Sequence, residues 1–241
     1  MSLARRHRER MLAQAASVQV AATGTRSGPA ASEYQLMLAR LGVDLRRLHD
    51  IQSIEGKIAL KRELLPEYGA WVAGALEADA GGADEIVTHM MIWRIDVGDF
   101  APAIDLARYV LRHKLPLPER FDRTAPTLLA EEIADAALKS FGQGQTGPAP
   151  VSLAILDAVA ELVDGEDIFD QVRAKLEKAI GYTLAAQAPA ADADGPAGAR
   201  RAALDLALGH LRRALALDEG SGVKTRIQQL EKELKKLTPA E

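Results

Sequence analysis

The stretch MIWRIDVGDFAPAIDLARYVL, residues 91–111, contains one glycine between two segments with helical spacing. Before the glycine, apolar residues recur every three or four positions, as they do on one face of a helix: Ile86, Met90, Trp93 and Val97. Gly98 stands where a glycine often ends a helix, and Asp99 is suited to cap the next one. We therefore predict a helical hairpin, with Asp96 and Asp99 either in its joint or acting as carboxylate ligands of a metal.

The composition extends this helical pattern to the whole chain. Hydrophobic residues make up 48% and charged residues 27%, which is an ordinary globular balance, whereas aromatic residues make up only 4%. Strands prefer aromatic and β-branched residues, and no segment alternates at a period of two for long. We predict an all-α protein, and the 241 residues allow one or two domains.

Turn-forming segments divide the chain into three predicted regions. Residues 1–31 form a basic N-terminal helix, from Leu3 to about Ala22, followed by the linker TGTRSGPAA. Residues 32–142 form a helical core. It begins with a capping box, Ser32 with Gln35, which starts one long central helix of about 30 residues that Pro66 ends.

The third predicted region, residues 151–241, is a C-terminal helical domain that ends in a helix pair. Two apolar stripes on either side of the turn EGSG indicate this pair: Leu204, Leu208, Leu211 and Leu215, then Val223, Ile227, Leu230, Leu234 and Leu237. Its alanine and leucine spacing is of the tetratricopeptide kind, although no period repeats three times.

Several classes of site are disfavoured by what the chain lacks. Without cysteine there is no disulfide, thiolate zinc site or catalytic thiol. GQGQTG, residues 142–147, matches GxGxxG, but a helical segment precedes it and prolines follow, so we interpret it as a linker. There is no phosphate-binding loop of an ATPase, the five histidines are scattered, and no apolar run is long enough to span a membrane. We expect no bound cofactor.

Charge is distributed unevenly along the chain, although the net charge is only −4. Basic residues gather in the first quarter, and two groups are candidates for contact with DNA phosphates: Arg5, Arg6, Arg8 and Arg10, and secondarily Lys57, Lys61 and Arg62. A solubilising surface explains the same residues equally well.

Acidic residues allow an alternative, catalytic hypothesis. A nuclease uses two or three converging carboxylates to hold Mg²⁺, and the candidates are Asp96, Asp99, Glu131 and Asp135. Such residues also occur on solvated helix faces and in the first turns of helices, which is the interpretation that we favour. Asp96 lies near a predicted helix C-terminus, where the helix dipole disfavours it, so we expect an arginine partner, Arg94 or Arg108.

Five segments together resemble the small terminase subunit family of tailed phages with cohesive-end genomes, also known as terminase endonuclease subunits. They are KRELLPEYGAWVAGALE, MIWRIDVGDFAPAIDLARYVLRHKLPLPERFDRTAP, LAEEIADAA, VRAKLEKAIGYTL and GVKTRIQQLEKELK. The resemblance covers most of Ser32 to Lys236 and is densest from Lys61 to Ala137, around WRIDxGD.

The resemblance implies a role in packaging the genome of a phage or prophage. Such a subunit forms a homo-oligomer, for which a ring is one arrangement, and binds double-stranded viral DNA at the packaging site. It recruits the large ATPase and nuclease subunit, and it works in the host cytoplasm. The alternative that the family's second name implies is a metal-dependent endonuclease that cuts the cohesive-end site itself.

Overall fold

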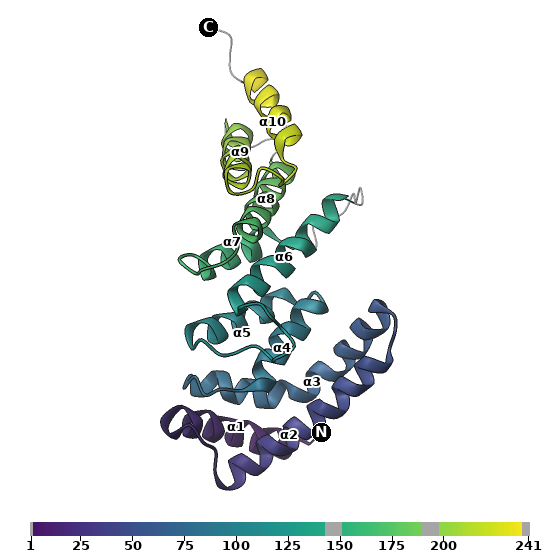
Figure 1. Ribbon diagram of the computed structural model, residues 1–241, viewed down its shortest axis with the longest axis vertical. Coiled ribbons are helices and arrows are strands. Elements are labelled where there is room, and N and C mark those ends of the chain that lie inside the picture. The colour runs from purple at the N-terminus through teal and green to yellow at the C-terminus, as the bar shows by residue number, and fades with distance from the viewer. Residues whose placement is uncertain (1, 143–150, 189–197, 238–241) are drawn as a thin grey trace. The chain divides into compact units, whose positions relative to one another are not determined.

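The computed structural model describes residues 2–142, 151–188 and 198–237, and within these ranges it contains ten α-helices and no strand. The all-α prediction is confirmed (Figure 1). The helices are α1 (Leu3–Thr23), α2 (Gly28–Asp50), α3 (Ile54–Ala78), α4 (Glu85–Asp96), α5 (Phe100–Arg112), α6 (Ala125–Gly142), α7 (Leu153–Leu162), α8 (Asp170–Gln187), α9 (Ala199–Leu217) and α10 (Lys224–Leu237).

The chain divides into two compact units, Met1–Ala125 and Pro126–Glu241. Unit 1 contains α1 to α5, and unit 2 contains α6 to α10. Among the described residues no helix combines the length and the apolar character needed to cross a membrane. The predicted linker that contains GxGxxG lies, apart from Gly142, outside the described residues. The sequence APAADADGPAGA, residues 188–199, also predicts a linker, and residues 189–197 lie outside the described residues as well.

The long central helix predicted from Ser32 to Pro66 is wrong in its boundaries, because two helices occupy this region. Helix α2 begins at Gly28, inside the predicted linker, and ends at Asp50. Ser53 then caps α3, since its side chain accepts a hydrogen bond from the Gly56 amide at 3.1 Å. The apolar stripe of Leu41, Leu45 and Leu48 changes phase at Ile51 and Ile54, next to the capping serine, so the cap and the stripe both indicate a break here.

The sequence predicted that Pro66 ends a helix, but this residue lies inside α3. A proline within a helix removes one backbone hydrogen bond and costs about 3 kcal/mol. The residues after it, Tyr68 and Trp71, are completely buried, and each contributes roughly 1.5–3 kcal/mol through burial. Tertiary packing therefore outweighs the local preference of the proline.

The predicted hairpin of residues 86–111 is present as α4 and α5. Gly98 adopts a φ of +79°, in the left-handed region that favours glycine, immediately after α4. Helix α4 is buried along nearly its whole length, with contacts to α3 on one side and α5 on the other. The hairpin is thus the centre of unit 1 rather than a surface feature.

Helix α1 packs closely on α3, and this packing defines its position in unit 1. A Cβ atom added at Gly74 of α3 would lie 2.2 Å from the Arg10 carbonyl oxygen, so only glycine permits this approach. Ala13 and Ala16 of α1 are 1% and 0% exposed. The N-terminal helix is therefore docked on the helical core and is not a free arm.

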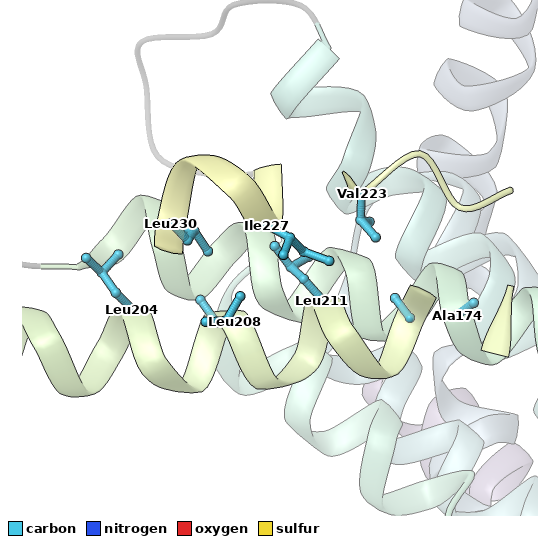
Figure 2. Packing of buried hydrophobic residues seen from close by; sticks show 9 residues of the cluster. Ala174, Leu204, Leu208, Leu211, Val223, Ile227 and Leu230 are labelled. Carbon is cyan, nitrogen blue, oxygen red and sulfur yellow. The ribbon is translucent and has the colours of Figure 1, made fainter. Parts of the chain in front are cut away.

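Unit 2 has an aliphatic core in which α8, α9 and α10 meet. Figure 2 displays Leu204, Leu208 and Leu211 of α9 facing Ile227 and Leu230 of α10. Helix α9 packs on α8 as well, and α7 also contacts α8. The predicted C-terminal helix pair is confirmed, while its likeness to tetratricopeptide hairpins stays a prediction.

Candidate nucleic-acid interface

The four arginines of the first predicted set lie in the first turns of α1. Ser2 caps the helix by accepting a hydrogen bond from the Arg5 amide at 3.3 Å. Arg5, Arg6 and Arg8 are exposed, and within the described part of the chain their side chains make no hydrogen bond or ion pair. Arg6 and Arg8 are therefore available to an anionic partner, and Arg5 is exposed as well, although its charge also acts on Glu9.

Arg10 differs from the three arginines before it. Its guanidinium forms an ion pair with Glu77 near the end of α3, and Gln14 donates to the same carboxylate at 2.8 Å. The charge of Arg10 thus contributes to the docking of α1 on α3.

The second predicted set, Lys57, Lys61 and Arg62, lies in the first half of α3. Lys61 forms an ion pair with Asp96, and Arg62 donates to the Val97 carbonyl oxygen at 3.0 Å. Two of the three side chains therefore join α3 to the end of α4. Lys57 is half-buried.

The structure corrects the predicted partner of Asp96. Lys61, 35 residues earlier in the chain, occupies the place expected for Arg94 or Arg108. Arg94 instead forms an ion pair with Asp99. Asp99 does stand at the N-cap position of α5, but its side chain makes no capping hydrogen bond because it is turned to Arg94.

The hollow beside this turn has a volume of 440 Å³. It is lined by Arg62, Leu65, Pro66, Arg94, Val97, Gly98 and Asp99. Asp99 is the one carboxylate in this lining, and it is already paired with Arg94. The hollow therefore lacks the converging acids on which a two-metal nuclease depends.

The other two catalytic candidates, Glu131 and Asp135, lie one turn apart on α6 in unit 2. Lys175 of α8 bridges them, with distances of 3.2 Å to Glu131 and 3.0 Å to Asp135. Throughout the described ranges no three histidine, aspartate or glutamate side chains are grouped so that they could hold a metal ion. Each candidate acid has a basic partner from the protein itself.

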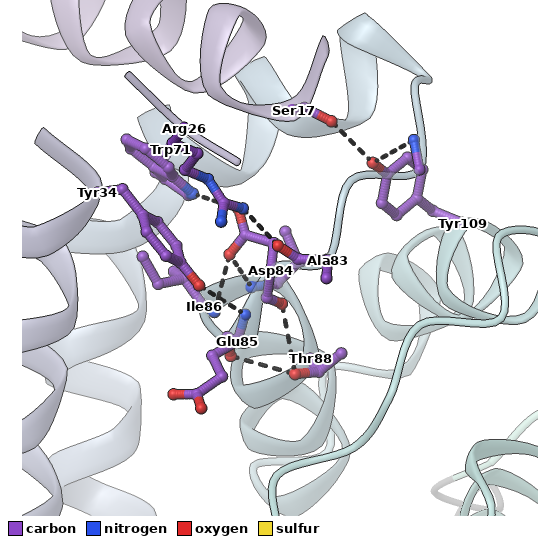
Figure 3. A network of polar contacts seen from close by, with 12 residues as sticks. Ser17, Arg26, Tyr34, Trp71, Ala83, Asp84, Glu85, Ile86, Thr88 and Tyr109 are labelled. Carbon is purple, nitrogen blue, oxygen red and sulfur yellow. Dashed lines mark hydrogen bonds and ion pairs between the residues drawn. The ribbon is translucent and has the colours of Figure 1, made fainter. Parts of the chain in front are cut away.

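The most connected polar group in unit 1 is Asp84, which the sequence reasoning missed (Figure 3). This buried residue caps α4 by accepting hydrogen bonds from the Ile86 and Val87 amides at 2.9 and 3.3 Å. Its second carboxylate oxygen accepts from the Trp71 indole at 2.9 Å. Burial raises the pKa of Asp84, and the Trp71 bond and the Arg26 charge oppose that rise. The available signal was an aspartate directly before an apolar helical pattern.

Arg26, in the segment between α1 and α2, joins this network. Its guanidinium lies 3.7 Å from the centre of the Tyr34 ring, 3.9 Å from Asp84, and donates to the Ala83 carbonyl oxygen. The Tyr34 hydroxyl accepts from the Glu85 amide at 3.2 Å, and burial raises the pKa of Tyr34 to about 12. These contacts fix the start of α4 against α2.

A second polar contact joins α1 to α5, and Figure 3 includes it. The hydroxyls of Ser17 and Tyr109 lie 3.2 Å apart, and the Gly81 amide donates to Tyr109 at 3.1 Å. This contact fixes the orientation of α1 on unit 1. Both sets of contacts are structural: the Asp84 network fixes the start of α4, and the contact between Ser17 and Tyr109 fixes α1, the helix that carries the exposed arginines.

His89 illustrates why a buried polar residue in unit 1 need not be a ligand. Its Nδ1 atom lies 2.8 Å from the Glu85 carbonyl oxygen one turn earlier, and the ring is buried. Burial lowers its pKa, which favours the neutral ring.

Comparison with known proteins places these features in a family. The sequence model described as phage small terminase subunit matches residues 38–171. The chain is 41% identical over 205 residues to the terminase endonuclease subunit of Escherichia phage P2, an alignment that covers 85% of this chain and 76% of the P2 protein. No solved structure matches the chain. More than half of the chain matches the family model and a relative is similar over most of both lengths, so the chain belongs to the phage small terminase subunit family.

Proposed function

We propose that this protein is the subunit that binds double-stranded viral DNA at the packaging, cohesive-end site and recruits the large ATPase and nuclease subunit in the host cytoplasm. Membership of the family supports the coarser role in phage genome packaging. The observation that carries the DNA-binding proposal is the group of three exposed arginines, Arg5, Arg6 and Arg8, on a docked helix. Arginine side chains neutralise phosphates and release counterions, which gives salt-dependent binding.

The test compares two variants in a titration of labelled duplex DNA at several salt concentrations. Simultaneous Arg→Gln change at positions 5, 6 and 8 should lower the slope of log affinity against log salt by up to about three, at roughly 0.9 per phosphate contact. Arg10→Gln is the matched control, because that side chain is paired with Glu77 and should leave the slope unchanged. An unchanged slope in the triple variant contradicts the assignment to α1.

We also propose that the protein works as a homo-oligomer. Two pairs of exposed apolar residues support this, each pair seven positions apart: Met11 and Val18 on α1, and Leu36 and Val43 on α2. A spacing of seven places each pair on one helix face, as in a coiled-coil seam. The double change Leu36→Asp and Val43→Asp should lower the native mass to that of a smaller assembly, whereas Leu206→Asp, at an exposed position of unit 2, should not. An unchanged mass in the double variant contradicts this surface.

The name of the P2 relative, terminase endonuclease subunit, supports a second candidate, an endonuclease activity of the chain itself. The pairing of Asp96, Asp99, Glu131 and Asp135 with basic partners argues against it. Purified protein without the large subunit should therefore leave cohesive-end DNA intact in Mg²⁺ or Mn²⁺. Specific cuts that Asp99→Asn abolishes would establish the second candidate.

A further inference from the structure

We propose that the outer face of α10 is a second phosphate-binding surface for duplex DNA, separate from α1. The surface consists of Lys224, Lys232, Lys235 and Lys236 and is called the α10 lysine face. The inference rests on the proposed DNA binding and adds to it a site in unit 2. It concerns a segment outside residues 38–171, the part of the chain that the family model matches.

The packing of α10 leaves one side of this helix exposed. Its apolar side is occupied by the core of unit 2, where Val223, Ile227 and Leu230 are buried against α9 (Figure 2). With 3.6 residues per turn, the four lysines fall within about 120° of arc, on the side opposite this apolar stripe. All four side chains are exposed.

The acids of α10 pair with arginines of α9. Glu231 pairs with Arg212 at 2.7 Å, and Glu233 pairs with Arg200 at 3.2 Å. Arg226 of α10 lies 4.0 Å from Glu233. Both acids flank the buried stripe, so their negative charge is used at the contact between the two helices.

This arrangement leaves an excess of positive charge on α10. Helix α10 carries five basic and two acidic side chains, and the two acids are already paired. In the described part of the chain, no hydrogen bond or ion pair involves the side chains of the α10 lysine face. Four like charges on one face repel one another, and an anion with several charges relieves that repulsion.

The chemistry of the surface selects among polyanions. Residues 199–237 contain no phenylalanine, tyrosine or tryptophan, the side chains that usually stack the bases of a single strand. The apolar residues of α10 pack in the core of unit 2, so none is left to insert into a membrane. Lysine ammonium groups act as point charges that contact phosphates without reading sequence. The face from Lys224 to Lys236 spans about 18 Å of helix, comparable to about five phosphates along one strand of a duplex.

The experiment measures binding of the full chain to a labelled duplex over a range of salt concentrations, with the charge of α10 as the variable. Changing all four lysines to glutamine should lower the salt slope by up to about four and weaken binding at least tenfold at roughly 50 mM salt. Changing the same four to arginine keeps the charge and should preserve both quantities. Both variants should remain folded, because neither change touches the buried stripe. Circular dichroism checks this.

The possible results separate this inference from the proposed function. If the wild-type chain does not bind duplex DNA at low salt, the proposed function itself fails. If the wild type binds and the glutamine variant binds equally, only the α10 lysine face is overturned. A polyglutamate peptide serves as a second probe: binding of that peptide as tightly as DNA, and its loss in the glutamine variant, would assign the face to an acidic protein and overturn the DNA assignment.

Discussion

The cores of the two units are built from different chemistry. Unit 1 buries both tryptophans of the chain and, among the described residues, all of its buried charged side chains, including Glu9, Asp44 and Asp84. The cluster at the centre of unit 2 consists of alanine, leucine, valine and isoleucine. Buried hydrogen-bonded groups favour one arrangement of the helices but are costly when a partner is lost. Aliphatic packing instead loses stability in proportion to the volume removed. Mutations in unit 1 should therefore destabilise the fold by leaving buried polar groups without partners, and mutations in unit 2 by removing buried volume.

The largest effect should come from Asp84→Ala in unit 1. The change leaves the Trp71 indole and two backbone amides of α4 without an acceptor in a buried site, which should cost about 3–5 kcal/mol of stability. Tryptophan fluorescence during denaturant unfolding measures this, since both tryptophans lie in unit 1. Asp105→Ala, at an exposed position of α5, is the control. A loss below about 1 kcal/mol would show that the network contributes little.

Removing buried volume from unit 2 should have the next largest effect. Leu211 is completely buried between α8, α9 and α10, so Leu211→Ala should cost about 3 kcal/mol. Leu206→Ala on the exposed side of α9 should change stability by less than about 0.5 kcal/mol. We expect the loss of stability to appear in denaturant unfolding followed by circular dichroism and not in unfolding followed by tryptophan fluorescence. An equal shift in both signals would mean that the two cores unfold together.

A smaller effect of opposite sign is expected at Glu9, which is buried on α1. Burial, assisted by the charge of Glu33, raises the pKa of this carboxyl, while Arg5 and Arg40 oppose the rise. The folded chain therefore holds the proton more tightly than the unfolded chain, and Glu9 lowers stability as pH rises above its ordinary pKa. Glu9→Gln should stabilise the protein at neutral pH by on the order of 1 kcal/mol and reduce this pH dependence.

Thermal unfolding of wild type and Glu9→Gln at pH 4 and pH 7 measures that difference. The gain should be larger at pH 7. There the folded wild type either buries a charged carboxylate or keeps a proton that the unfolded chain releases, and both lower its stability. A variant that is less stable than wild type at pH 7 contradicts the direction of the pKa shift.

The smallest effect is expected from an ion pair at the surface of unit 2. Lys175 bridges Glu131 and Asp135, and its side chain is 30% exposed. Because solvent screens such pairs, Lys175→Gln should cost no more than about 1 kcal/mol in denaturant unfolding. A cost as large as that of Asp84→Ala would remove the distinction between the buried network of unit 1 and the ion pairs of unit 2.

Sequence reasoning predicted the helices and their order well, because apolar periodicity and turn residues are local signals. It correctly placed Gly98 between α4 and α5. It failed at Pro66, where burial of Tyr68 and Trp71 continues the helix against the local preference. Sequence reasoning also could not identify the partner of Asp96, since Lys61 lies on another helix.

The candidate interface was predictable in composition but not in availability. The four arginines of the first segment look alike in the sequence, yet Arg10 is paired with Glu77 while Arg6 and Arg8 are exposed without a described partner. Whether a charge is free or paired depends on contacts between helices far apart in the sequence. The acids of α10 are a further example, because the pairing of Glu231 with Arg212 is visible only in the structure.

The docking of α1 on α3 has a consequence for the thermodynamics of any ligand that α1 binds. A disordered basic tail loses conformational entropy when it binds, and this loss offsets part of its affinity. In this chain that ordering is completed during folding, through the glycine contact at Gly74 and the contact between Ser17 and Tyr109. A phosphate that meets Arg5, Arg6 and Arg8 therefore finds a preorganised backbone, and only the mobility of three side chains is lost on binding.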